Sequence, residues 1–105
     1  TYSTEDLTQE IGKALGALKE CEGIIIFTDL MGGTPFNVAA QLGHGKENIR
    51  IVAGTNLPML VEIVMSRKFM DDLDGLVDSI LETGKEQIVK YEFKQVVQEE
   101  SEDGI

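Results

Sequence analysis

One stretch of the chain, residues 23–37, constrains the fold more than any other. It begins with the apolar run Ile24–Phe27, which is rich in β-branched residues and leads directly to Asp29. A short continuous run of this kind is typical of a strand buried on both faces, and such strands belong to parallel sheets covered by helices. After Gly32-Gly33, whose backbone has no Cβ to restrict it, Thr34-Pro35 predicts a helix with the threonine as N-cap and the proline in the first position. The stretch therefore predicts a strand, a loop that carries a carboxylate, and a capped helix, as in an α/β fold.

The loop between this strand and this helix is the candidate functional site. Ligands of open α/β sheets bind outside the carboxyl ends of the strands, which is where Asp29 is expected to lie. Helix N-termini attract anions, because their free N–H groups and the helix macrodipole both favour negative charge. A carboxylate, the hydroxyl of Thr34 and backbone N–H groups are thus expected at one place. The alternative interpretation of Asp29 and Thr34 is structural, a strand-end turn followed by an N-cap.

Hydrophobic periodicity predicts the other elements. The expected helices cover residues 4–20, 35–42, 57–67 and 71–84, and the expected strands cover residues 23–28, 48–53 and 88–97. Gly84 is expected to end the last helix. The alternation of helices and strands predicts a three-layer α/β fold, an open and mainly parallel sheet with helices on both faces. In residues 88–97, Val89, Tyr91 and Phe93 alternate with charged residues, which predicts a C-terminal antiparallel edge strand.

The predicted sheet is small for four amphipathic helices. We therefore expect that part of the sheet is absent from this sequence or is supplied by another chain. The last eight residues, 98–105, contain four carboxylates and predict an acidic tail outside the packed domain.

Composition narrows the classes of function. The 105 residues have a formal net charge of −10, which disfavours nucleic acid and anionic membranes as main partners. No apolar run approaches the length of a membrane span. The single cysteine, Cys21, rules out an internal disulfide and suits a reducing compartment, so a cytoplasmic location is expected. Neither a metal site nor a cofactor is expected.

Two motifs carry a resemblance to a known family. The first is Thr28-Asp29-Leu30-Met31-Gly32-Gly33-Thr34-Pro35-Phe36-Asn37, and the second is Gly54-Thr55-Asn56-Leu57-Pro58-Met59-Leu60. In order and spacing they resemble the signature of the mannose-family enzyme IIA domains of the bacterial sugar phosphotransferase system. The similarity extends from about Ser3 to about Gln87.

The resemblance implies a phosphocarrier. Such a domain is a protein-histidine phosphotransferase component, which takes phosphate from the carrier protein HPr and passes it to a sugar-specific IIB protein through a histidine. In the family that histidine ends a first strand, which a helix and a second strand follow, and this sequence lacks the matching segment. The sequence is therefore either a fragment or a degenerate member of the family. We favour a fragment, and expect residues 1–97 to form a partial mannose-type domain that is inactive by itself.

The resemblance also assigns roles in the first motif. Asp29 aligns with the carboxylate that hydrogen-bonds the active histidine, where it would fix the tautomer and stabilise the charge that develops during transfer. Thr34 aligns with a hydroxyl residue beside the phosphate. The backbone N–H groups of Met31, Gly32, Gly33 and Thr34 would hold the phosphoryl oxygens.

Residues 56–58 and His44 are further candidates for the site. Asn56, Leu57 and Pro58 align with a neighbouring loop, although a structural helix start explains these residues equally well. His44 is the single histidine, and with the glycine after it mimics the histidine-glycine pair of the family's active site. It follows an expected helix end, however, whereas the family's histidine follows a buried strand, and a cation at a helix C-terminus is ordinary dipole complementation. His44 is therefore not expected to be catalytic.

The implied partners are HPr and the IIB protein, with the membrane involved only indirectly through the IIC and IID permease and with no nucleic acid. A homodimer that exchanges the C-terminal strand is also implied. An alternative is a regulatory module of a transcription activator, controlled by phosphorylation. A nucleotide or phosphosugar pocket is a weaker alternative, because no Walker lysine follows the glycines and no Gly-x-Gly-x-x-Gly is present.

Overall fold

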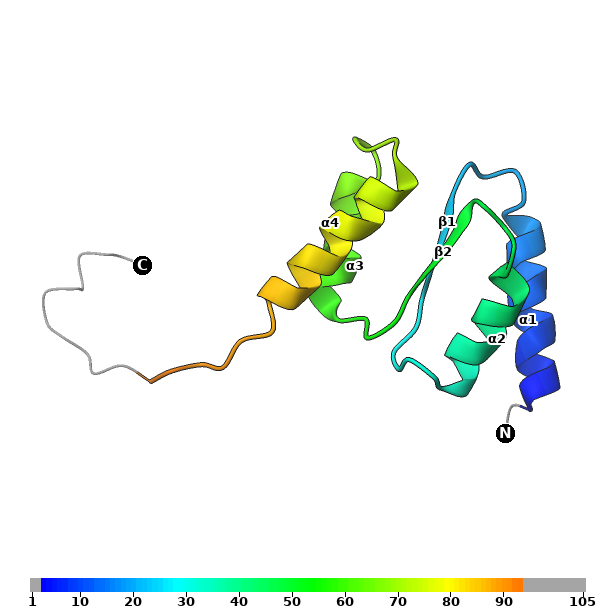
Figure 1. Cartoon of the computed structure of the whole chain (residues 1–105), viewed down its shortest axis with the longest axis horizontal. Coiled ribbons are helices and arrows are strands. Elements are labelled where there is room, and N and C mark those ends of the chain that lie inside the picture. Colours follow the sequence, from blue (N-terminus) through cyan, green and yellow to red (C-terminus); the bar gives the residue numbers. More distant parts are fainter. Residues whose placement is uncertain (1–2, 94–105) are drawn as a thin grey trace, which may run out of the picture.

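The computed structural model describes residues 3–93, which form an α/β fold (Figure 1). Its elements follow in the order α1 (Thr4–Ala17), β1 (Ile24–Phe27), α2 (Thr34–Gly43), β2 (Ile49–Val52), α3 (Leu57–Ser66) and α4 (Leu73–Glu86). These bounds agree to within a few residues with the four predicted helices and with the first two predicted strands. Across residues 3–93, no helix has the length and apolar character that a membrane span requires.

The two strands β1 and β2 run parallel and form the sheet. Their register pairs Ile24 with Ile49 and Phe27 with Val52. The pairing continues beyond β1, because the N–H of Thr28 donates to the carbonyl of Val52 over 2.8 Å. The β-branched side chains of both strands favour this extended backbone, and α2 provides the crossover that a parallel pair requires. The carboxyl ends of both strands consequently meet at one edge of the sheet.

Two pairs of helices flank the sheet. In Figure 1, α1 and α2 pack together on one side of the strands, and α3 and α4 pack together on the other. The main core lies between the sheet and the second pair, where four buried side chains meet: Val52, Met59, Leu76 and Ile80. On the other side, Ile24 of β1 and Val38 and Ala39 of α2 are buried. The α/β class predicted from the sequence is therefore confirmed.

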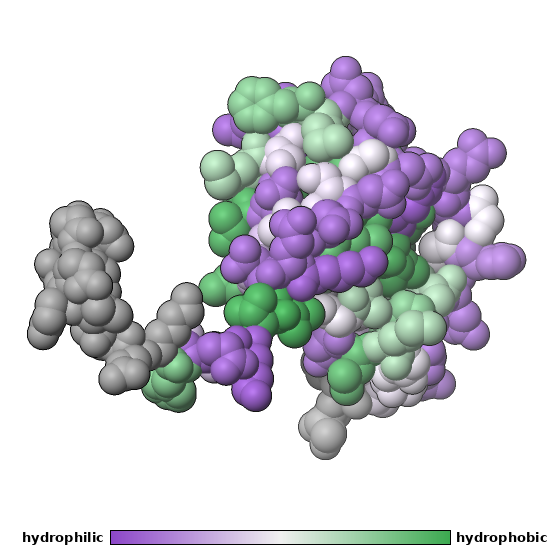
Figure 2. Space-filling model, turned by 60° about the vertical axis from the view of Figure 1, so that its left-hand side comes forward, coloured by the Kyte–Doolittle hydropathy of each residue, from purple (hydrophilic) through white to green (hydrophobic). Residues whose placement is uncertain are grey.

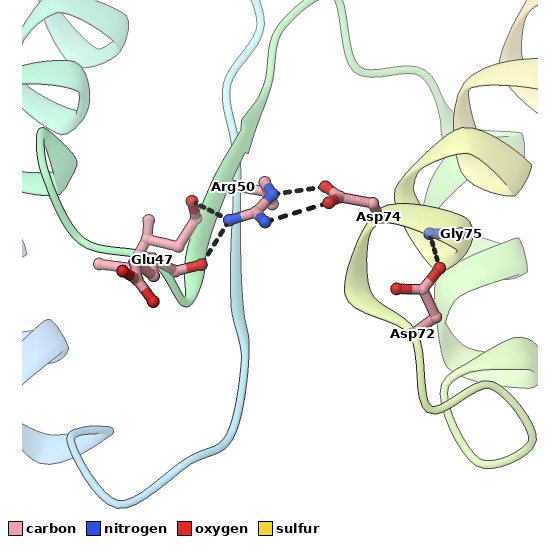
Figure 3. A network of polar contacts seen from close by, with 6 residues as sticks. Glu47, Arg50, Asp72, Asp74 and Gly75 are labelled. Atoms are coloured by element: carbon pink, nitrogen blue, oxygen red, sulfur yellow. Dashed lines mark hydrogen bonds and ion pairs between the residues drawn. The ribbon is translucent and has the colours of Figure 1, made fainter.

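An ion pair connects β2 to the beginning of α4 (Figure 3). The guanidinium of Arg50 donates through Nε to Oδ1 of Asp74 over 2.6 Å and through Nη2 to Oδ2 over 3.2 Å. Its Nη1 also donates to the carbonyl of Glu47 over 2.7 Å. The hydrogen bond from Arg50 lowers the pKa of Asp74. Beside this pair, Asp72 caps α4 by accepting from the N–H of Gly75 over 3.0 Å, so the first turn of α4 is fixed both to the sheet and by its own cap.

Gly84 does not end the last helix, contrary to the prediction. Helix α4 continues to Glu86, and Gly84 is buried against Met59 of α3. A Cβ at Gly84 would lie 2.5 Å from Cε and 2.8 Å from Cγ of Met59. The carbonyl of Gly84 also accepts a hydrogen bond from Nδ2 of Asn56 over 3.1 Å. Glycine occupies this position because the contact between the two helices leaves no room for a side chain.

The predicted edge strand at residues 88–97 is wrong over its described part. Residues 88–93 have no strand conformation, and they lead from the end of α4 away from the sheet (Figure 1). In a single chain this segment therefore reaches no edge of β1 or β2, and a strand needs such an edge for its hydrogen bonds. Four apolar side chains of the segment are exposed: Ile88, Val89, Tyr91 and Phe93. Residues 94–97 and the predicted acidic tail 98–105 lie outside the described residues.

Helix α3 exposes a further group of apolar side chains. They are Leu57, Leu60, Val61, Val64 and Met65. Figure 2 brings the α3–α4 side of the molecule forward and shows hydrophobic surface next to hydrophilic surface there. A helix that is apolar on nearly all sides is typical of an element that is covered in the assembled protein.

Candidate functional site

Asp29 lies directly after β1, at the carboxyl edge of the sheet. Its side chain is exposed, and its Oδ1 accepts a hydrogen bond from the N–H of Leu30 over 2.7 Å. Within the described part of the chain only Oδ1 is engaged, which leaves Oδ2 available to an incoming donor. An exposed carboxylate with one oxygen already oriented can accept a proton or a hydrogen bond from a partner in a defined direction.

The turn after Asp29 is built on glycine. Gly32 has a φ of +86°, in the left-handed region that residues with a Cβ rarely adopt. Its carbonyl accepts a hydrogen bond from Nδ2 of Asn37 over 3.1 Å, and the N–H of Gly33 donates to the carbonyl of Leu30 over 3.3 Å. These bonds close the loop onto the first turn of α2. Met31 is 80% exposed at the tip of this turn.

Thr34 is not the N-cap that the sequence predicted. Helix α2 begins at Thr34 itself, with Gly33 as the N-cap, and no side chain caps the helix. Threonine and glycine are both acceptable at this position, and the extended backbone of Gly33, with φ −74° and ψ 171°, decides between them. Since no side chain occupies the N-terminus of α2, its first N–H groups remain available to an anion.

The second motif contacts the first through the backbone. The N–H of Gly54 donates to the carbonyl of Asp29 over 2.8 Å, and Thr55 donates to the carbonyl of Thr28 through its N–H over 3.1 Å and through its hydroxyl over 2.7 Å. Sequence reasoning did not assign a site role to Gly54 or Thr55. The signal that could have found them is their place just after β2, whose carboxyl end lies beside that of β1 in a parallel pair.

The other predicted members of the second loop are less closely connected to the site. The side chain of Asn56 caps α3, accepting from the N–H of Met59 over 3.3 Å, while its Nδ2 donates to Gly84 of α4. Both ends of this amide therefore serve the packing of α3 and α4. Leu57 is 71% exposed, and Pro58 is half-buried in the first turn of α3. The geometry favours the structural interpretation of Asn56.

An open cavity of about 660 Å³ extends along α2 from its N-terminus. Thr34, Asn37, Gln41 and His44 line it from α2, and Thr4 lines it from α1. His44 caps the opposite end of α2 from Thr34. A helix of ten residues separates its ends by about 15 Å, so His44 belongs to the far end of the cavity, away from the turn after Asp29.

The site has little positive charge of its own. Neither loop, residues 28–37 or residues 53–58, contains a lysine or an arginine. Among residues 3–93, no three histidine, cysteine, aspartate or glutamate side chains are grouped so that they could hold a metal ion. What the arrangement offers chemically is one oriented carboxylate beside an uncapped helix N-terminus.

A parallel strand followed by a carboxylate, a glycine turn and an open helix N-terminus define an α/β domain with a candidate anion site at the carboxyl edge of its sheet. The family model of mannose-type EIIA proteins, described as the PTS system fructose IIA component, matches residues 1–81. The chain belongs to this family of EIIA components of the sugar phosphotransferase system, as the two motifs indicated.

Relatives with curated names support the same assignment. The PTS system mannose-specific EIIAB component of Escherichia coli K12 is 35% identical over 94 residues, which are 90% of this chain and 29% of that protein. The PTS system sorbose-specific EIIA component of Lacticaseibacillus casei is 35% identical over 82 residues, which are 78% of this chain and 58% of that protein. The chain thus spans less than a third of the first relative and somewhat more than half of the second.

Solved structures share the fold. The phosphotransferase system component EIIA from Streptococcus agalactiae has a TM-score of 0.73 at 34% identity, over 84% of this chain and 67% of that one. The mannose/sorbose specific IIA subunit from Enterococcus faecalis has a TM-score of 0.74 at 26% identity, over 90% of this chain and 70% of that one.

Proposed function

We propose that this chain is the larger part of a phosphocarrier domain that relays phosphate from HPr to a IIB protein during sugar uptake. The phosphate is carried by a histidine of a preceding strand, which residues 1–105 do not include. Residues 1–97 are the partial domain, and residues 98–105 are an acidic tail. The single observation on which the proposal rests is the exposed carboxylate of Asp29 at the carboxyl end of β1.

Asp29 is proposed to accept the Nδ1–H of that histidine. The bond holds the imidazole in the tautomer whose Nε2 is free to attack phosphorus, and it stabilises the positive charge that develops on the ring. The exposure of Asp29 and the free Oδ2 support this role, since Oδ1 is already oriented by Leu30.

The phosphoryl oxygens are proposed to lie at the start of α2. Their donors are the backbone N–H groups of Met31, Gly32, Gly33 and Thr34, with the hydroxyl of Thr34 beside them. The N–H of Gly33, which donates to the carbonyl of Leu30 over 3.3 Å, would be shared with the phosphate. The uncapped N-terminus of α2 supports this proposal, because its N–H groups and dipole are not occupied by a side chain. Asn56, Leu57 and Pro58 are proposed to be the neighbouring loop of the site, in which the side chain of Asn56 serves to cap α3.

The chain by itself is proposed to be inactive in transfer. Its single histidine, His44, lies at the end of α2 opposite the glycine turn, about 15 Å from Thr34. A role in transport is favoured over a regulatory module of a transcription activator, because the relatives named above are transport components. Family membership supports a cytoplasmic location, with the membrane reached only through the IIC and IID permease.

The test is phosphate uptake by the full-length gene product. Incubation with phosphorylated HPr should yield an acid-labile phosphoryl group on a histidine outside residues 1–105, and the IIB protein should discharge it. Replacing Asp29→Asn should slow the transfer by about 100-fold or more, because the tautomer and the developing charge lose their partner.

The matched control is Asp78→Asn, which removes one exposed carboxylate from α4. It should leave the transfer rate unchanged. Absence of phosphate on the wild-type protein, or equal rates for Asp29→Asn and Asp78→Asn, would contradict the proposal.

A further inference from the structure

We propose that Thr55 is a positioning residue for Asp29, an inference that rests on the proposed phosphocarrier function. The carbonyl of Thr28 accepts two hydrogen bonds from Thr55, one from its hydroxyl over 2.7 Å and one from its N–H over 3.1 Å. The next carbonyl, that of Asp29, accepts from the N–H of Gly54 over 2.8 Å. The two peptide planes on either side of the Asp29 Cα are therefore both held by the loop after β2.

Holding both planes restricts the backbone of Asp29. Rotation about its φ or ψ would carry one of the two carbonyls away from its donor and break a hydrogen bond. The fixed backbone also keeps the N–H of Leu30 in place, and this group orients Oδ1 of Asp29 over 2.7 Å. Because the carboxylate is exposed, its direction depends on these bonds rather than on packing. A carboxylate that must meet an imidazole needs such a fixed direction.

The hydroxyl of Thr55 is the only side-chain group among the three donors. The N–H groups of Gly54 and Thr55 belong to the backbone and persist in most substitutions, whereas the hydroxyl can be removed selectively. Valine has the same shape as threonine without the donor, so Thr55→Val removes this bond together with the longer contact of the hydroxyl to the carbonyl of Val52 over 3.4 Å. Thr55→Ser keeps the donor and loses only a methyl group.

The role can be measured without any phosphate transfer. By NMR on the full-length gene product, Thr55→Val should speed the hydrogen exchange of the Leu30 amide by about fivefold or more, since a hydrogen bond of about 1 kcal/mol is lost. The side-chain couplings of Asp29 should change from those of one χ1 rotamer to averaged values. Thr55→Ser should retain the wild-type behaviour, and Thr55→Ala provides a second removal of the hydroxyl if Thr55→Val does not fold.

The matched control is Thr8→Val. Thr8 likewise donates its hydroxyl to a backbone carbonyl, that of Thr4 over 2.8 Å, but it does so on α1. This variant should leave the Leu30 amide and the Asp29 rotamer unchanged. If a folded Thr55→Val chain also leaves both unchanged, the inference is overturned.

Transfer kinetics of the full-length gene product separate this inference from the proposed function. Thr55→Val should lower the transfer rate at saturating phosphorylated HPr by about fivefold to tenfold with little change in KM, because the lost hydroxyl is part-buried and bonded within the chain. In an Asp29→Asn background it should have no further effect. A full additional loss in that background would overturn the inference. A wild-type protein that takes up no phosphate would instead refute the proposed function, and the NMR comparison would still decide the role of Thr55.

Discussion

Single residues in this chain decide how closely its elements approach one another. Gly84 of α4 allows Met59 of α3 to lie against the helix backbone, whereas Gly16 of α1 is exposed and has no atom within 4 Å of where a Cβ would be. The two glycines thus occupy helix interiors for different reasons. At Gly84 the side chain of Met59 fills the space that a Cβ would take, whereas at Gly16 that space is empty.

Replacing Gly84→Ala should destabilise the protein. The added Cβ would clash with Met59, and overpacking of this kind costs about 1–3 kcal/mol, which outweighs the gain of about 1 kcal/mol in helix propensity. Gly16→Ala should instead stabilise the protein by about 0.5–1 kcal/mol, because only the propensity changes. Urea unfolding of both variants measures the two effects, and equal shifts in the same direction would contradict this account of Gly84.

The site residues differ in how far the sequence could predict them. The position of Asp29 at a strand end followed from the apolar run before it, and the helix end at His44 followed from the glycines around it. The place of Thr55 at the carboxyl edge could have been predicted, but its contact with Thr28 could not, because that contact depends on the register between two strands that are distant in sequence. The cap of α2 was assigned to the wrong residue because threonine and Gly33 both suit a helix start.

At the scale of elements, a carboxylate joins α3 to α4. Oε2 of Glu62 accepts a hydrogen bond from the hydroxyl of Ser66 on its own helix over 2.7 Å and from the hydroxyl of Ser79 on α4 over 3.0 Å. These bonds, that of Ser66 first, lower the pKa of Glu62 below its ordinary value of 4.5. Because the folded state favours the ionised form, Glu62 stabilises the helix pair when it is charged.

This stabilisation should depend on pH. It is fully present above the unfolded-state pKa of glutamate and is lost as the pH falls through the lower pKa of the folded state. Glu62→Gln should therefore be less stable than the wild type at neutral pH, and the difference should disappear in acid. Unfolding midpoints across this range test the prediction. Glu82→Gln, an exposed change on α4, should show no comparable pH dependence, and a constant deficit for Glu62→Gln at all pH values would be inconsistent with it.

Local sequence patterns were sufficient to predict most elements of the fold, but not the conformation of residues 88–93. The hydrophobic pattern within each segment was enough to predict helices α1 to α4 and strands β1 and β2. The prediction that Gly84 ends the last helix was wrong. Glycine both ends helices and permits close contacts between helices, and the sequence alone does not distinguish the two uses. Residues 88–93 have the alternation of a strand, but a strand forms only where a partner edge is within reach.

The molecule as a whole leaves apolar surface uncovered. The sheet of the described residues has two strands, and exposed apolar side chains remain both on α3 and in residues 88–93. Tyr91 and Phe93 contact each other edge to face, with ring centroids 4.9 Å apart. Surface of this kind is what the homodimer implied by the family resemblance would cover, with the segment that begins at residue 88 pairing with the partner instead of with its own sheet.

Substitutions in this segment should change the oligomeric state. Tyr91→Ser together with Phe93→Ser should convert a dimer into a monomer, because the apolar side of the exchanged strand is lost. Lys90→Ser together with Glu92→Ser, which alter only the polar side, should leave the dimer intact. Light scattering reports the mass in solution. A monomeric wild-type protein, or a dimer that survives the aromatic substitutions, would refute the exchange.

The lack of lysine and arginine in the two loops at the carboxyl edge bears on how the phosphate is passed along. A fixed cation would bind a phosphoryl group through strong charge-assisted bonds and retain it. A helix dipole adds only about 0.3–1 kcal/mol. On the proposed function, residues 28–37 and 53–58 hold the phosphoryl group through neutral donors, so its departure to the acceptor does not have to break an ion pair with either loop.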